Sequence, residues 1–234
     1  MPTVVPLDYD SDPERFLANW RIQTELRGQP TGDVHPLVAA RFADAGARRV
    51  VDIGGAHGKL ADLVRASGAS AVVVDVSMTM LARATPPRVL ADGVRLPFPS
   101  ASFDAAAALW TLYHFGDPER AVREAYRVLR SGGVFAACAP SRFNDPEVAD
   151  VLPRWGEPLS FDAEVAPDLV GSVFDAVEVV TWNEPMLQLA TRDELALFLR
   201  SRGLAESVAE TAAAERTLPV DVTKRGCLVY ATKD

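Results

Sequence analysis

The sequence predicts an α/β fold: a doubly wound, mostly parallel sheet of seven strands, preceded by a helical segment. Short apolar runs of strand length alternate with helical patterns from Arg48 onward. The strands are almost continuously apolar, which is typical of a parallel sheet covered on both faces. A length of 234 residues, with 48% of them hydrophobic, suits one domain with a substantial core.

Residues 1–46 are predicted to form a helical cap before the sheet. Asp12, followed directly by a proline, is typical of a helix start, and this helix would present Phe16 and Trp20 on one face. A break rich in glycine and proline comes next. Residues 35–45 then form a second helical stretch that leads into the first strand.

Seven apolar runs predict the strands of the sheet. Four valines mark the second strand, and a nearly unbroken series of alanines marks the fourth. Acids or turn residues follow most of these runs. The predicted strands are residues 49–53, 71–76, 88–90, 103–109, 134–139, 176–182 and 226–232.

Helix signals fill the intervals between the strands. The clearest helix spans residues 118–130, where Asp117 is the N-cap, Pro118 takes the first helical position and residues 131–133 (Ser-Gly-Gly) end the helix. A capping box at residues 191–194 opens a later helix. The other predicted helices are residues 60–66, 77–84, 163–173 and 206–216.

Charge and composition disfavour several classes of function. The net charge is −8 and no lysine or arginine block occurs, which argues against nucleic-acid binding. The start of the chain lacks the pattern of a signal peptide, and no apolar stretch is long enough to span a bilayer, so we expect a cytoplasmic protein without membrane contact. The two cysteines are expected to be buried free thiols. The three histidines lie too far apart in the sequence to predict a metal site.

The most informative segment is residues 51–58 (VDIGGAHG), where an apolar run ends in an acid and breaks into a glycine-rich turn before a helix. Such turns hold nucleotide-like ligands against bare backbone. The glycines fit neither register of a dinucleotide loop, and Lys59 is followed by leucine where a P-loop needs serine or threonine. Asp52 would repel a polyphosphate. A ligand with cationic groups and no phosphate therefore suits this loop.

Two further acids follow strands of the predicted sheet. Asp75 ends the second strand, where an acid commonly binds the two hydroxyls of a ribose; alternatively it caps the helix that begins near Ser77. Asp92 follows the third strand and either accepts a hydrogen bond from an exocyclic amine or serves only as a turn residue. Ligands of doubly wound sheets bind beyond the carboxyl ends of the strands, so these acids and the glycine loop would share one site.

Four segments in this order resemble the class I S-adenosylmethionine-dependent methyltransferases. Residues 51–58 resemble their first motif, and residues 74–77 (VDVS) their second. Residues 91–99 (ADGVRLPFP) are similar to the third region of the ubiquinone/menaquinone-biosynthesis-like branch, known as methyltransferase type 11. Residues 129–133 (LRSGG) are similar to the motif that opens the fifth strand. The resemblance implies a Rossmann-like fold and methyl transfer from S-adenosyl-L-methionine, with S-adenosyl-L-homocysteine as the product.

The resemblance also implies roles in the first motif. Gly54 and Gly58 would let the backbone approach the methionine part of the cofactor, and Asp52 would favour its ammonium group. Ala56 stands where the usual pattern has a glycine, a replacement that a negative φ would tolerate. Gly55 completes the loop. The cofactor-binding half of the domain would then be residues 47–140.

In the later motifs, Asp75 would bind the ribose, with Val76 and Met78 beside the adenine. Asp92 would accept from the adenine amine, and the Val94 N–H would donate to a ring nitrogen, with Gly93 between them in the same cofactor-binding turn. The remaining residues implied at the site line the methionine and sulfonium end, just past the fourth strand; they are Leu109 and Trp110.

The acceptor is expected to be a small molecule, a specialised metabolite or a quinone-like precursor, bound by a monomer or homodimer. Residues 141–234 would form the substrate-side half, and residues 1 to about 32 a cover over the acceptor. His114 is the candidate general base for an acceptor that must lose a proton; the alternative is that it packs at the head of the helix that follows Asp117.

Two other functions share the predicted fold. One is a non-catalytic module that keeps S-adenosylmethionine as a ligand. The other is a nicotinamide-dependent oxidoreductase, which the register of the glycines disfavours. A nucleic-acid methyltransferase is disfavoured by the negative charge and by the lack of an N-P-P-Y-type tetrad after the fourth strand.

Overall fold

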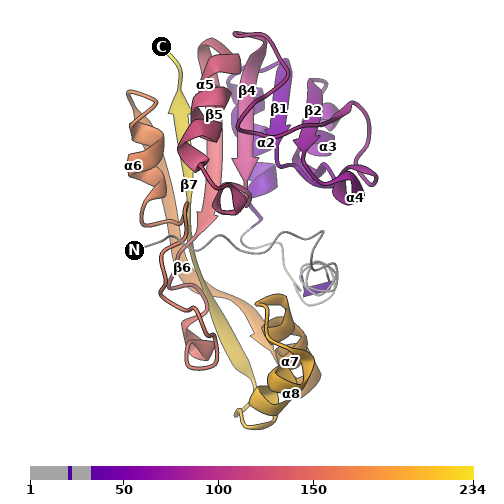
Figure 1. Cartoon of the computed structure of the whole chain (residues 1–234), viewed down its shortest axis with the longest axis vertical. Coiled ribbons are helices and arrows are strands. Elements are labelled where there is room, and N and C mark those ends of the chain that lie inside the picture. Colours follow the sequence, from indigo (N-terminus) through magenta and orange to yellow (C-terminus); the bar gives the residue numbers. More distant parts are fainter. Residues whose placement is uncertain (1–20, 23–32) are drawn as a thin grey trace.

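The computed structural model describes residues 21–22 and 33–234, and its centre is a seven-stranded sheet (Figure 1). The strand order is β3-β2-β1-β4-β5-β7-β6. Strands β1 to β5 pair in parallel, and β7 pairs antiparallel with both β5 and β6. The predicted doubly wound, mostly parallel sheet is confirmed. The strands are β1 (Arg49–Ile53), β2 (Ser70–Asp75), β3 (Arg88–Leu90), β4 (Phe103–Leu109), β5 (Leu129–Pro140), β6 (Val177–Leu189) and β7 (Val220–Thr232).

Helices cover both faces of the sheet. The core on one face contains side chains of α2 and α3, and the core on the other contains side chains of α5 and α6. Because β1 lies between β2 and β4, the strand order reverses at β1, which is where ligands of such sheets bind. The helices are α2 (Val34–Asp44), α3 (Lys59–Ala66), α4 (Met78–Leu81), α5 (Pro118–Val128), α6 (Ala166–Gly171), α7 (Arg192–Ser201) and α8 (Glu206–Ala214), with 3-10 turns η2 (Leu112–His114) and η3 (Pro146–Val148).

Two helix starts follow the predicted capping chemistry. The Asp117 side chain accepts a hydrogen bond from the backbone N–H of Arg120 at 3.0 Å. In the capping box of α7, the Glu194 backbone N–H donates to Thr191 Oγ1, and the Glu194 carboxylate accepts from the Thr191 backbone N–H. Both interactions satisfy backbone donors that have no partner inside the helix.

The predicted end of the helix at 130 is wrong, because α5 ends at Val128. The next residue, Leu129, pairs with Phe103 of β4, so β5 begins directly after α5 ends. Residues 131–133, predicted to stop the helix, lie inside β5 near an irregularity in its pairing with β4. A Cβ on Gly133 would lie 2.8 Å from the carbonyl oxygen of Arg130, so close backbone approach requires glycine there.

Two further helices are shorter than predicted. The stretch 77–84 contains only the single turn α4, which the Ser77 hydroxyl caps by accepting from the Met80 N–H at 3.1 Å. The stretch 163–173 contains only the six residues of α6. In both places the helical pattern continues as turns, because short connections lead directly to the next strand.

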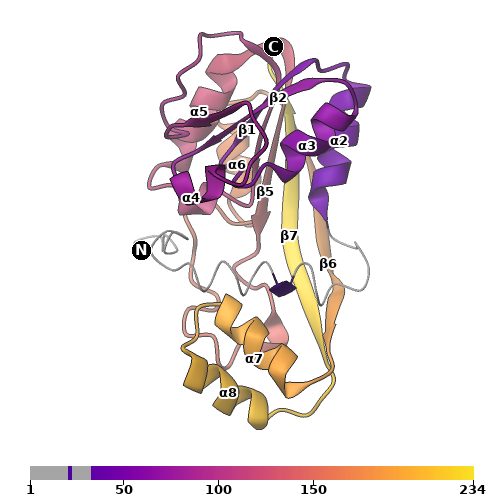
Figure 2. The ribbon, with the colours of Figure 1, turned by 90° about the vertical axis from the view of Figure 1, so that its right-hand side faces the viewer.

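Strands β6 and β7 extend beyond the predicted ranges and form an arm that leaves the sheet (Figures 1 and 2). Helices α7 and α8 pack on this arm with η3 and form an apolar core of their own. Ile22, only 4% exposed, belongs to this arm core. The predicted helix at Asp12, and all but residues 21–22 of the predicted cover, fall outside the described residues.

The two cysteines are free thiols in the centre of the sheet, as expected. Cys138 lies in the core on the α2 face, and Cys227 in the core on the α5 face, so the sheet separates the two sulfur atoms. Burial raises the pKa of both thiols, that of Cys227 to about 12. Among the described residues, no helix combines the length and apolar character needed to cross a membrane, and no three histidine, cysteine or acidic side chains gather as metal ligands would.

Candidate functional site

Three acids mark the carboxyl ends of three neighbouring parallel strands. Asp52 lies in β1, Asp75 ends β2, and Asp92 follows β3 by two residues. The order β3-β2-β1 places these strand ends side by side at one edge of the sheet. Their environments differ, since Asp52 is buried, Asp75 half-buried and Asp92 exposed. The structure therefore brings together the three acids that the sequence singled out.

The glycines of the loop after β1 are required by their surroundings. Gly54 has φ +65°, and a Cβ on it would lie 2.0 Å from Thr111 Oγ1. A Cβ on Gly55 would lie 2.5 Å from the Asp52 carboxylate, and Gly58 adopts φ +84° at the start of α3. These positions exclude side chains for reasons internal to the fold. Thr111, which sequence reasoning missed, packs directly against the loop.

The condition under which Ala56 would be tolerated without cost, a negative φ, is not met. Ala56 adopts φ +48°, in the left-handed region that favours glycine. Its backbone N–H donates to Asp75 Oδ2 at 3.0 Å, so a hydrogen bond to the neighbouring strand helps to hold the residue in this conformation. The Ala56 methyl group therefore carries a conformational cost that the usual glycine avoids.

The carboxylate of Asp75 links the glycine loop to the end of β2. Oδ2 accepts from Ala56, and Oδ1 accepts from the backbone N–H of Ser77 at 2.9 Å. The expected N-cap role belongs to Ser77 rather than to Asp75, because the Ser77 hydroxyl caps α4. Beside Asp75, Val76 and Met78 are 65% and 62% exposed, which is unusual for apolar side chains and makes a surface open to a ligand.

Asp52 is a buried carboxylate with little compensation. Its pKa is raised to about 6, chiefly by burial and in part by the negative charge of Asp75, while the charge of His35 and a backbone hydrogen bond from Ala61 oppose the shift. A cation placed between Asp52 and Asp75 would relieve both effects. An ammonium group is chemically suited to this position.

The loop after β3 is a tight turn. The Val94 N–H donates to Asp92 Oδ1 at 3.0 Å. The two groups that we expect to bind the adenine are therefore hydrogen-bonded to each other in this structure. A Cβ on Gly93 would lie 2.7 Å from the Phe115 ring and 2.8 Å from Ile53, which requires glycine. Gly93 thus packs the turn against β1 and against the segment that follows β4.

Aromatic side chains follow β4 at the same edge. Leu109 is buried, and Trp110 adopts φ +57°, an uncommon conformation for a bulky residue. The backbone N–H of Trp110 donates to the carbonyl of Cys138 at 3.1 Å. The Trp110 ring packs edge-on against Trp182 of β6, with ring centroids 6.0 Å apart. Strained backbone of this kind is often found at ligand sites.

His114 ends η2 next to these rings. Its ring lies against Tyr113, with centroids 4.5 Å apart, and its backbone N–H donates to the Thr111 carbonyl at 2.8 Å. The Ser160 hydroxyl contacts the carbonyl oxygens of Tyr113 and Phe115 at 3.3 and 3.2 Å, which fastens η2 to the segment after β5. The imidazole is thereby held beyond the carboxyl end of β4.

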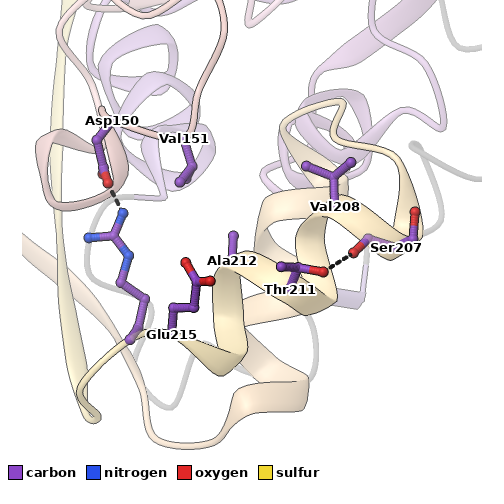
Figure 3. Close-up of a pocket in the computed structure, with 8 residues that line it drawn as sticks. Asp150, Val151, Ser207, Val208, Thr211, Ala212 and Glu215 are labelled. Carbon is purple, nitrogen blue, oxygen red and sulfur yellow. Dashed lines mark hydrogen bonds and ion pairs between the residues drawn. The ribbon is translucent and has the colours of Figure 1, made fainter.

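A separate hollow of about 560 Å³ lies on the arm, between the η3 segment and α8 (Figure 3). An ion pair between Arg216 and Asp150 crosses one side of it, and the Thr211 hydroxyl donates to the Ser207 carbonyl on the other. None of the acids or glycines of the strand-end site lines this hollow. The candidate functional site is therefore the edge of the sheet, not the arm.

Comparison with known proteins identifies the family. The methyltransferase domain family matches residues 51–137, which include the loops after β1, β2, β3 and β4. A demethylmenaquinone methyltransferase of Corynebacterium kroppenstedtii is 30% identical over 161 residues, which are 68% of this chain and 68% of that protein. The chain is a class I S-adenosylmethionine-dependent methyltransferase. It belongs to the ubiquinone/menaquinone-biosynthesis-like branch, as the resemblance implied.

Other relatives of this methyltransferase agree with that family. A rice protein named 2-methyl-6-phytyl-1,4-hydroquinone methyltransferase 2 is 35% identical over 101 residues, and the match spans 29% of the length of that relative. A solved structure of an S-adenosylmethionine-dependent methyltransferase from Thermotoga maritima aligns with a TM-score of 0.60 at 20% identity, over 97% of each chain. The structural likeness extends the shared fold beyond the cofactor-binding segment.

The raised pKa of Asp52 in this methyltransferase predicts a stabilising substitution. At about pH 8, Asp52→Asn is expected to raise the free energy of unfolding of the cofactor-free protein by about 1–3 kcal/mol, because it removes a buried charge of equal shape. The folded-state pKa is about 6 against an ordinary 3.8, so the penalty is present above about 6 and disappears below 3.8. Urea unfolding at about pH 8 and about pH 4 measures the difference.

A buried acid at the opposite edge of the sheet serves as the control. Asp104 accepts hydrogen bonds from the backbone N–H groups of Arg48 and Arg49, at 2.7 and 2.9 Å, and pairs with Arg130. Asp104→Asn should therefore lower stability at about pH 8. Stability of Asp52→Asn at or below that of the parent would contradict the view that the buried charge of Asp52 destabilises the cofactor-free protein.

Proposed function

We propose that this methyltransferase transfers a methyl group to a small-molecule acceptor at the carboxyl edge of β1 and β4. The single observation that carries the placement is the alignment of Asp52, Asp75 and Asp92 at three neighbouring strand ends, beside the exposed Val76 and Met78. This set matches the chemical parts of the cofactor, which has an ammonium group, a ribose and an adenine. The site residues implied by the resemblance thus receive physical support.

The fit of each group follows from its surroundings. The buried Asp52, whose pKa is raised to about 6 by burial, suits an ammonium group. Asp75 suits two ribose hydroxyls once its carboxylate exchanges the bonds to Ala56 and Ser77 for ligand contacts. Asp92 suits the adenine amine, which leaves the Val94 N–H, or that of Gly93, to donate to a ring nitrogen.

S-adenosylmethionine supplies an activated methyl group on a sulfonium. The chain therefore has to position the acceptor in line and exclude water. Apolar walls for this task come from Leu109 and Trp110 at the carboxyl end of β4, and from Trp182 of β6. We assign to His114, at the end of η2, the role of accepting a proton from an acceptor hydroxyl or amine.

The acceptor we propose is a planar, quinol-like ring or a similar specialised metabolite. The paired rings of Trp110 and Trp182 favour an aromatic partner. Relatives named for a hydroquinone and for demethylmenaquinone agree with this class. A net charge of −8 argues against a nucleic-acid acceptor. We propose a cytoplasmic monomer or homodimer, with a cofactor half at 47–140 and a substrate-side half at 141–234.

An incubation with S-adenosylmethionine and a panel of acceptors tests this function. Simple hydroquinones, catechols, aliphatic amines and short oligonucleotides are offered in parallel, and both S-adenosylhomocysteine and the methylated product are measured by mass spectrometry. Methylation of the aromatic hydroxyl compounds alone is the expected result. Methylation of oligonucleotides alone would contradict the proposal, and cofactor binding without any transfer would favour the non-catalytic module.

Asp75→Ala is expected to weaken S-adenosylhomocysteine binding by about 1–3 kcal/mol, because it removes charge-assisted hydrogen bonds to two ribose hydroxyls. Titration calorimetry gives the dissociation constant, and circular dichroism checks the fold. Asp117→Ala is the control, since this acid caps α5 through Arg120. If Asp75→Ala binds as tightly as the parent, Asp75 only holds the loop through Ala56.

A further inference from the structure

The start of α2 places three charged side chains beside the glycine loop, and we call them the Asp33 cluster: Asp33, His35 and Lys59. Asp33 is the N-cap of α2, and its Oδ1 lies 3.2 Å from the backbone nitrogen of His35 and 2.7 Å from His35 Nδ1. Its Oδ2 lies 2.8 Å from Lys59 Nζ. Lys59 is the first residue of α3 and directly follows Gly58. The cluster therefore fastens α2 to the end of the glycine loop.

The charges of this cluster shift the pKa values of two side chains at the glycine loop. Burial raises the pKa of Asp52, and the positive charge of His35 is the largest opposing influence. Burial lowers the pKa of His57, and the charges of His35 and Lys59 lower it further. The side chains of Asp33 and His35 are 16% and 19% exposed, so water screens them only in part. His35 therefore lies within electrostatic reach of Asp52, which precedes the loop glycines, and of His57, which lies among them.

With an imidazolium at His35, the cluster would have a net charge that matches one further carboxylate. Burial raises the pKa of Asp33, but hydrogen bonds to His35 and Lys59 bring it well below its usual range, so Asp33 is ionised. Lys59 neutralises this charge. Only an imidazolium carries N–H groups on both ring nitrogens, and Nδ1 faces Asp33, so Nε2 is the nitrogen that remains for another acceptor. With His35 protonated, the cluster bears a net charge of about +1.

The methionine end of the cofactor carries an ammonium and a carboxylate on one carbon atom. Asp52 suits the ammonium, which leaves the carboxylate in need of a cation at the same loop. We propose that His35 binds this carboxylate through Nε2, oriented by Asp33 through Nδ1. His35 is then a positioning residue that fixes the methionine chain, and with it the sulfonium, against the loop. This inference rests on the cofactor placement proposed above.

A pair of ligands that differ only in the carboxylate tests the inference. S-adenosylhomocysteine carries it, and S-adenosyl-3-thiopropylamine has the same adenosine, thioether and amine without it. Titration calorimetry is run with the parent, His35→Gln and His35→Lys. His35→Gln is expected to bind S-adenosylhomocysteine about 10- to 100-fold more weakly while binding the carboxylate-free ligand as the parent does. His35→Lys, which restores a cation, should recover part of the loss.

Arg83→Gln is the matched control, because Arg83 also lowers the pKa of His57 but lies after α4, outside the cluster. It should not discriminate between the ligands. Equal weakening of both ligands by His35→Gln, or of neither, would overturn the inference. If His35→Gln does not fold, His35→Asn also removes the cation and gives the same comparison. Failure of the parent to bind S-adenosylhomocysteine would overturn the cofactor placement as well.

Discussion

Gly54→Ala is expected to lower the free energy of unfolding by about 2–5 kcal/mol and to abolish cofactor binding. Two effects add at this position. The backbone has φ +65°, where an L side chain is strained, and the new Cβ would lie 2.0 Å from Thr111 Oγ1 and 2.7 Å from Thr111 Cβ. To remove this clash, either the glycine loop or Thr111 has to move. Urea unfolding with parallel titration of S-adenosylhomocysteine measures both losses.

Gly46→Ala separates the two effects. Gly46 has φ +69°, close to that of Gly54, but a Cβ there would meet no atom within 4 Å. It should therefore cost only the backbone term of about 1–2 kcal/mol and leave cofactor binding intact. Equal destabilisation by the two substitutions would contradict the close packing of Gly54 on Thr111.

His114→Ala is expected to lower kcat about 100-fold or more for an acceptor that loses a proton, with cofactor affinity nearly unchanged. The imidazole follows β4 at the edge where the methyl group is proposed to project, and η2 holds it against Tyr113. The measurement is steady-state kinetics over a range of pH, together with the dissociation constant for S-adenosylhomocysteine. A general base should also change the pH dependence of kcat.

Tyr113→Phe is the control for packing, because it keeps the ring that lies against His114. It should leave kcat and the pH profile nearly unchanged. Joint loss of kcat and cofactor affinity in His114→Ala would show a packing role instead. Full retention of kcat would mean that positioning alone supports the reaction, a known possibility for transfer from an activated sulfonium.

The parallel part of the fold was predictable because its strands are short, apolar and bounded. Residues 49–53, 88–90 and 103–109 match the observed β1, β3 and β4 to the residue. The arm was not predictable, because the outer part of β6 begins with Asn183, Glu184 and Pro185, which interrupt the strand pattern before the apolar residues that follow. Pairing with β7 extends it instead, and a partner strand leaves no local signal.

The candidate site was predictable where chemistry is local in sequence and not where it depends on packing. Asp52, Asp75 and Asp92 could be found because each follows an apolar run, and their strands are adjacent in the sheet. Thr111 acts only by touching Gly54, which no spacing reveals. Asp33 left a weak signal, an acid two residues before His35, but its pairing with α3 depends on how the two helices pack.

The most direct test of the account is a crystal structure of the full chain with S-adenosylhomocysteine. We expect the ribose hydroxyls on the Asp75 carboxylate, the amine beside Asp52 and the sulfur beyond the ends of β1 and β4, with the adenine against Val76 and Met78. A ligand seated elsewhere, such as in the hollow between η3 and α8, would contradict it. So would a ligand at the sheet edge with Asp75 still bonded only to Ala56 and Ser77.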